Sequence, residues 1–123
     1  MKFVRSFIGE DGQSYYEHIA VDLSIDLELK GIRAVRVHAS DPDSPYHATT
    51  RRNLDVVVTG AIDATSSSGG DHRLRTRSLG EDLTGQGHKT RRLSWLAFVL
   101  LVDLEPDISI EAIFSSHTGH PDQ

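Results

Sequence analysis

Apolar residues occur in short runs that alternate with polar residues and end at turn formers, and this pattern constrains the fold most. Successive side chains of a β-strand point to opposite faces. Residues 53–60, NLDVVVTG, divide in this way, with Leu54, Val56 and Val58 on one face and Asn53, Asp55, Val57 and Thr59 on the other. A period of two that ends at a glycine is typical of strands. The sequence therefore predicts an all-β fold.

Further segments repeat the pattern at close spacing. We expect additional strands at 2–8, 17–25, 31–39, 61–65 and 72–77. The segments 40–47, which contains two prolines, and SSSGG at 66–70 are expected to be loops. Along 72–77 the alternation places Arg73, Arg75 and Arg77 on one face, which we interpret as a solvated outer face. Many short strands with turns between them are typical of a small sandwich or barrel.

The most apolar segment is 93–104, LSWLAFVLLVDL, and its pattern leaves two structures open. It is long enough for a buried helix, and periodicity does not separate the two structures in so apolar a run. Its β-branched and aromatic residues, and Pro106 after it, favour a long central strand.

The length of 123 residues predicts one domain, with N-terminal strands in 1–30 and a flexible tail at 115–123. The chain has no cysteine, which excludes disulfides and thiolate chemistry. A formal net charge of −5 argues against a nucleic-acid partner. The longest apolar run, 95–102, is shorter than the ~20 residues of a membrane span, and the first residues lack a signal-peptide pattern. We expect a cytoplasmic protein without a membrane partner.

Two of the seven histidines have neighbours that suggest a site. His47 follows the proline-containing loop, and His88 ends TGQGH. If their strands are neighbours, the imidazoles could converge on one metal ion or one substrate. Taken singly, each histidine is more often a solvated or hydrogen-bonded structural residue. His117 and His120, in the tail, are expected to be inert.

Two longer stretches carry a resemblance. HATTRRNLDVVVTG (47–60) and EDLTGQGHKTR (81–91) resemble the two motifs of a group of small single-domain cupins. FIGEDGQSYYEHIAVDL (7–23) is similar to the usual start of that group, so the resemblance covers nearly the whole chain. It implies a cupin-type double-stranded β-helix, a small antiparallel jelly-roll barrel with the pocket inside. It also implies a homodimer, for which 93–104 could supply the interface.

The resemblance places His47 and His88 at metal-ligand positions of the two motifs. The other two ligand positions hold Thr49, in place of a histidine, and Asn53, in place of a glutamate. A divalent ion (Fe, Mn, Ni, Zn or Cu) usually takes three or more protein ligands with some anionic charge. Asp55, on the strand face of Asn53, is a candidate for the missing ligand.

Charged residues near these motifs have two interpretations each. Asp55 would either reach an ion or face solvent or pair with Arg51 or Arg52. Asp82 would fix the tautomer of His88 or act as a base, or else accept backbone hydrogen bonds from the LTGQG turn. One of the two arginines should point to the pocket mouth and hold a substrate carboxylate or enolate, unless both form structural ion pairs.

Two functions follow. The first is an enzyme that acts on a small organic molecule, with or without a metal; the resemblance brings in dioxygenases, isomerases, decarboxylases and cyclases. Its catalytic candidates are His47, His88 and Asp82, and its ligand-binding candidates are Thr49, Arg51, Asn53 and Asp55. The second is a non-catalytic cupin with a degenerate metal site that binds a small ligand or serves as a scaffold.

Overall fold

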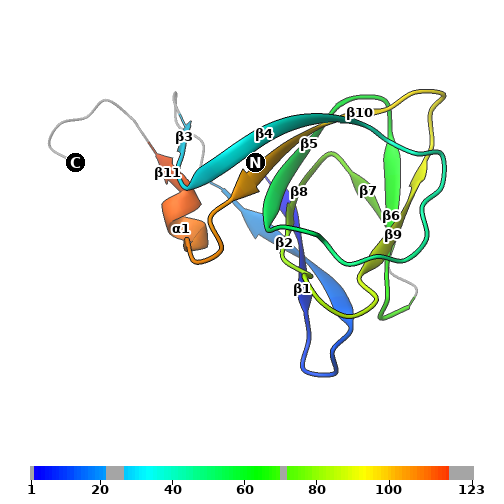
Figure 1. The fold of residues 1–123 in the computed structure, drawn as a ribbon, viewed down its shortest axis with the longest axis horizontal. Coiled ribbons are helices and arrows are strands. Elements are labelled where there is room, and N and C mark those ends of the chain that lie inside the picture. The colour runs from blue at the N-terminus through cyan, green and yellow to red at the C-terminus, as the bar shows by residue number, and fades with distance from the viewer. Residues whose placement is uncertain (1, 22–26, 70–71, 117–123) are drawn as a thin grey trace, which may run out of the picture.

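The computed structural model describes residues 2–21, 27–69 and 72–116. Along the chain the elements are β1 (Lys2–Ile8), β2 (Ser14–Ala20), β3 (Leu27–Leu29), β4 (Ile32–Ala39), β5 (Asn53–Thr59), β6 (Ile62–Ser66), β7 (His72–Arg75), β8 (Arg77–Gly80), β9 (His88–Arg92), β10 (Phe98–Leu104), α1 (Ile110–Ile113) and β11 (Phe114–Ser116) (Figure 1). The described chain is thus mostly β-strand, which confirms the all-β prediction.

The strands form two larger sheets and one short pair. The order in the six-stranded sheet is β2-β1-β8-β5-β10-β4, that in the three-stranded sheet is β7-β6-β9, and β11 pairs with β3. Neighbouring described strands are antiparallel except β1 and β8, which are parallel. In Figure 1 the three-stranded sheet lies at the right, and β1, β5 and β8 of the larger sheet lie to its left.

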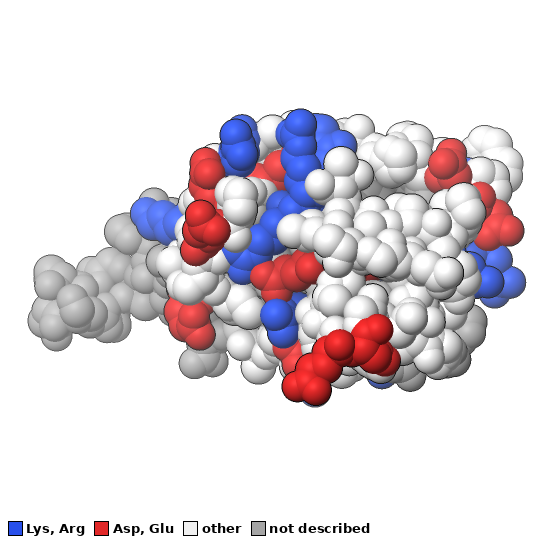
Figure 2. Space-filling model, turned by 60° about the horizontal axis from the view of Figure 1, so that its bottom comes forward, with Lys and Arg blue, Asp and Glu red and all other residues white. Residues whose placement is uncertain are grey.

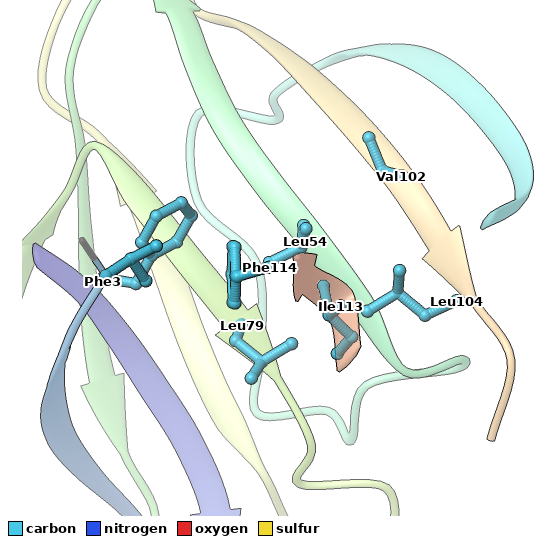
Figure 3. Close-up of a cluster of buried hydrophobic side chains, with 8 residues drawn as sticks. Phe3, Leu54, Leu79, Val102, Leu104, Ile113 and Phe114 are labelled. Carbon is cyan, nitrogen blue, oxygen red and sulfur yellow. The ribbon is translucent and has the colours of Figure 1, made fainter. Parts of the chain in front are cut away.

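The two faces of the six-stranded sheet have different roles. One face carries a buried apolar cluster that α1 and β11 help to cover: Phe3, Val21, Leu54, Leu79, Val102, Leu104, Ile113 and Phe114 (Figure 3). On the opposite face, Asp55 is paired in register with Ser78 and Leu101, and all three line a cavity. Strand alternation therefore separates the core from the site.

The segment 93–104 is a strand only from Phe98 onward, and the helix alternative is wrong. Its first residues form a loop because they pack against the turn at Gly60. Ser94 Oγ accepts a hydrogen bond from Ala61 N (2.9 Å) and donates one to Leu96 O (2.7 Å). A Cβ on Gly60, whose φ is +85°, would lie 2.1 Å from Leu96 O.

Other predicted strands agree to different degrees. Those at 2–8, 31–39, 53–60 and 61–65 are confirmed, apart from single residues at the ends and the added Ser66. The strand expected at 17–25 begins earlier, at Ser14, and ends at Ala20; residues 22–26 lie outside the described residues.

The prediction of one strand at 72–77 with an outward arginine face is wrong. The chain changes sheets at Thr76, so β7 pairs with β6, whereas β8 pairs with β1 and β5. Thr76 O still accepts a hydrogen bond from Val57 N (2.9 Å). Arg75 points inward as a result, and its side chain is only 14% exposed.

The end of the chain is described as far as residue 116. The tail was expected from residue 115, but β11 includes Ser115 and Ser116 and pairs with β3. His117 and His120 lie outside the described residues. Within the described part of the chain, no helix has the length and apolar character needed to cross a membrane.

Candidate functional site

A cavity of about 600 Å³ lies between the six-stranded and the three-stranded sheet. Both sheets and the loop between β4 and β5 contribute to its lining. Its apolar wall includes Val4, Ile62, Ala64, Val99 and Leu101, whereas most of its other lining residues are polar. A cavity volume in this range is typical of sites for small organic molecules, and the many polar side chains suit a polar one.

The structure brings the predicted site residues to this cavity. His47, Thr49, Arg51, Asn53, Asp55 and His88 all line it. Asp82 is fully buried and lies behind His88, to which it is hydrogen-bonded. Sequence reasoning missed Tyr16, Arg36, His38 and Arg75, which also line the cavity. For Tyr16 the alternation of β2 from Ser14 was an available signal.

Asp82 accepts four side-chain hydrogen bonds. Ser6 Oγ (2.9 Å) and Thr49 Oγ1 (2.6 Å) donate to Oδ1. Ser14 Oγ (2.8 Å) and His88 Nδ1 (2.7 Å) donate to Oδ2. Burial opposes ionisation of the carboxyl, but the hydrogen bond and the charge of His88, together with the bonds from Thr49 and Ser14, outweigh it and lower the Asp82 pKa to about 2. The group is therefore a carboxylate in neutral solution.

This low pKa predicts acid sensitivity. The carboxyl titrates near 3.8 when unperturbed and near 2 in the folded protein, so below pH 4 the unfolded chain binds the proton more readily. Asp82 therefore contributes about 2 kcal/mol of stability above pH 4, and this contribution is lost as the pH falls through 2. Urea unfolding between pH 7 and pH 2 measures it. The loss should be smaller in Asp82→Asn, and an identical pH dependence in both proteins would contradict the assignment.

Asp82 fixes the tautomer of His88. A carboxylate only accepts hydrogen bonds, so His88 Nδ1 carries a proton and Nε2 of the neutral ring has the lone pair. His88 lines the cavity and Asp82 does not, which leaves Nε2 as the ring nitrogen available to a bound molecule. A carboxylate that orients an imidazole in this way is typical of a general base.

His47 stands beside His88, with ring centroids 4.9 Å apart. The two residues exchange backbone hydrogen bonds, from His47 N to His88 O (2.8 Å) and from His88 N to His47 O (3.0 Å). His47 Nδ1 donates to Pro45 O (2.8 Å), because a carbonyl only accepts. Its Nε2 therefore also has the lone pair in the neutral ring. The two histidines therefore lie side by side, and their convergence on one metal ion or one substrate stays a prediction.

Gly87 permits this close approach. Its φ is +71°, and a Cβ there would lie 2.0 Å from His47 O and 2.7 Å from the Cα of Ala48. The glycine before His88 is thus required by the contact between the two histidine-bearing segments, in addition to the turn itself.

We expect Gly87→Ala to cost more stability than Gly12→Ala. Gly12 has a similar φ of +79° but no atom within 4 Å of an added Cβ. Both variants should lose about 1–3 kcal/mol from backbone strain. Gly87→Ala should lose about 1–3 kcal/mol more, because it overpacks against His47. Urea unfolding measures both losses, and equal values would contradict the role given to Gly87.

Asp55 is held by two residues that the sequence did not suggest. Arg75 Nη2 donates a hydrogen bond to Asp55 Oδ2. Ser78 Oγ donates one to Asp55 Oδ1 (2.5 Å). Neither interpretation of Asp55, as a metal ligand or as a partner of Arg51 or Arg52, included this ion pair with Arg75.

The available donors fall short of a conventional metal site. Among the described residues no three His, Cys, Asp or Glu side chains lie together in a way that would hold an ion. His47 and His88 offer two imidazoles, and the carboxylates of Asp55 and Asp82 are occupied by the bonds above. A divalent ion usually takes three or more protein ligands, so these residues do not fit one, and we derive no step through a metal.

Arg51 and Arg52 point in different directions. Arg51 lines the cavity, with Nη1 3.5 Å from Asp103 Oδ2, so it faces the cavity but is ion-paired, as the alternative interpretation expected. Arg52 is buried, and its Nε donates to Glu81 Oε2 (2.5 Å). Glu81 also accepts a hydrogen bond from Arg5. On the face shown in Figure 2, acidic side chains are interleaved with the basic ones.

In comparisons with known proteins, no family model and no curated protein matches the chain.

Proposed function

We propose that the protein is a cupin-type enzyme that uses His88 as a general base on a small organic molecule held in the cavity. The observation that carries the proposal is the hydrogen bond of 2.7 Å from His88 Nδ1 to the buried, ionised Asp82. In the neutral ring it leaves the lone pair on Nε2, beside a cavity of suitable size. The cupin assignment is supported by two sheets around one cavity and by the pairing of His47 with His88.

In this reaction His88 and Asp82 handle the proton, and three hydroxyl side chains position Asp82. His88 Nε2 removes a proton from the substrate, and the adjacent Asp82 carboxylate stabilises the resulting imidazolium. Ser6, Ser14 and Thr49 hold Asp82 in place through its remaining hydrogen bonds. General-base catalysis of this kind contributes about 10²–10⁴-fold to the rate.

A second candidate is a cupin that binds a small ligand without converting it. It is favoured by Thr49 and Asn53, which are neutral where the resembled family has ligands. The expectations of a homodimer, a cytoplasmic location, and no nucleic-acid or membrane partner stay predictions.

A turnover screen tests the proposal. Small ketones, keto acids, hydroxy acids and lactones are incubated with the protein in D₂O and followed by NMR. We expect wild-type protein to convert or exchange at least one of them, His88→Gln to lose that activity, and His18→Gln, at an exposed histidine on β2, to keep it. Undiminished activity in His88→Gln would contradict the proposal. Binding without any conversion or exchange would favour the second candidate.

A further inference from the structure

Two buried polar atoms lack hydrogen-bond partners at this cavity. Tyr16 Oη and Arg75 Nε are shielded from solvent, and neither has a partner among the described residues. Both residues line the cavity. Buried polar groups are nearly always paired, because leaving one unpaired is unfavourable. An acceptor atom on a molecule bound in the cavity would supply the partner that both groups lack.

Both groups are donors. Arg75 Nε–H has no other role, since the guanidinium pairs with Asp55 through Nη2. Burial, and then the negative charge of Asp82, raise the pKa of the Tyr16 phenol, so that it stays protonated in neutral solution. Two donors without an acceptor favour an oxygen atom as their partner.

Tyr16 lies on the same side of β2 as a partner of Asp82, and Arg75 interacts electrostatically with both Tyr16 and Asp82. Tyr16 lies two residues after Ser14 on β2, so both side chains face the same side, and Ser14 Oγ is bonded to Asp82. Arg75 is held at the end of β7 by Asp55, which Ser78 also contacts.

The charges around the cavity favour a substrate oxygen that is neutral when it binds. Arg36 and Arg51 both contact Asp103, and Arg75 contacts Asp55. Each arginine that lines the cavity thus already faces a carboxylate. Hydrogen-bond donors that are already in place, next to an oxygen that becomes negative only during the reaction, stabilise the transition state.

We propose that Tyr16 Oη–H and Arg75 Nε–H bind the carbonyl oxygen of the substrate, which is a small carbonyl compound with an acidic C–H beside the carbonyl. This rests on the proposed function of His88. Nε2 takes the proton from that carbon, the C–H electron pair becomes the C=C bond, and the carbonyl π pair moves to the oxygen. The two donors stabilise this enolate oxygen. Return of the proton from the imidazolium to carbon completes an isomerisation with no other reactant. In D₂O the imidazolium proton is replaced by a deuteron from the solvent, and its transfer to carbon completes an exchange.

Binding of 4-nitrophenolate tests the donors without turnover, because its oxygen resembles an enolate oxygen and its absorbance reports the ionised form. We expect wild-type protein to bind it, and Tyr16→Phe and Arg75→Lys to bind it about ten- to a hundredfold more weakly. Lysine keeps a cation beside Asp55 but lacks Nε–H. Tyr15→Phe is the matched control, because the Tyr15 hydroxyl is bonded to Asp11 outside the cavity (2.5 Å), and it should bind as wild type does.

Stability separates a lost contact from a damaged fold. Tyr16→Phe removes a hydroxyl without a partner, so its melting temperature should be unchanged or higher. Absence of binding by wild-type protein, or wild-type affinity in Tyr16→Phe, would overturn the inference. His88→Gln should still bind 4-nitrophenolate but lose proton exchange at carbon. Retained exchange in His88→Gln would overturn the role of His88 as the base. The binding of 4-nitrophenolate by Tyr16→Phe would still test the two donors independently.

Discussion

Asp82→Asn should lower the rate of the catalysed reaction about 10²–10⁴-fold, although it leaves the His88 ring in place. An amide has one acceptor oxygen, whereas the carboxylate accepts from four side chains. Where the amide NH₂ faces His88, the ring must accept at Nδ1 and carry its proton on Nε2. The lone pair that removes the substrate proton is then lost.

Two measurements separate this effect from simple destabilisation. Turnover in the NMR screen gives the rate, and ¹⁵N NMR of the His88 ring gives the tautomer, which should change in Asp82→Asn. Asp107→Asn, at an exposed position outside the cavity lining, is the control and should alter neither. A full rate in Asp82→Asn at temperatures where it is folded would show that Asp82 does not act through His88.

Asp55→Ala should destabilise the protein by about 3–5 kcal/mol. The side chains of Asp55 and Arg75 are 9% and 14% exposed, and removal of Asp55 leaves the guanidinium buried without its counter-charge. Ser78 Oγ loses its acceptor as well.

The double variant Asp55→Leu/Arg75→Met tests whether the unpaired charge of Arg75 causes the loss of stability in Asp55→Ala. It removes both charges and should recover most of the loss, because a buried ion pair can often be replaced by apolar residues at little cost. Urea unfolding measures both proteins. If Asp55→Ala costs less than about 1 kcal/mol, the ion pair does not have the structural role given to it here.

Local patterns predicted the parts of the site that depend on strand alternation. Asn53 and Asp55 were expected on one face of their strand, and both line the cavity. The pairing of His47 with His88 was expected only if their strands were neighbours, and the backbone bridge between the two residues shows that their segments are adjacent.

Other parts of the site depend on contacts between distant segments. The partners of Asp82 on β1 and β2 are 76 and 68 residues away from it along the chain. Arg75 points inward because the chain changes sheets at Thr76, and this follows from the pairing partners of β7 and β8. Alternation within 72–77 alone carries no sign of that change.

The tautomer of His88 in wild-type protein tests the central claim most directly. In ¹⁵N NMR, at a pH where the ring is neutral, we expect a protonated Nδ1 and an unprotonated Nε2, because Asp82 accepts the Nδ1 proton. A ring protonated on Nε2 instead would contradict the role of His88 as a base that Asp82 orients toward the cavity.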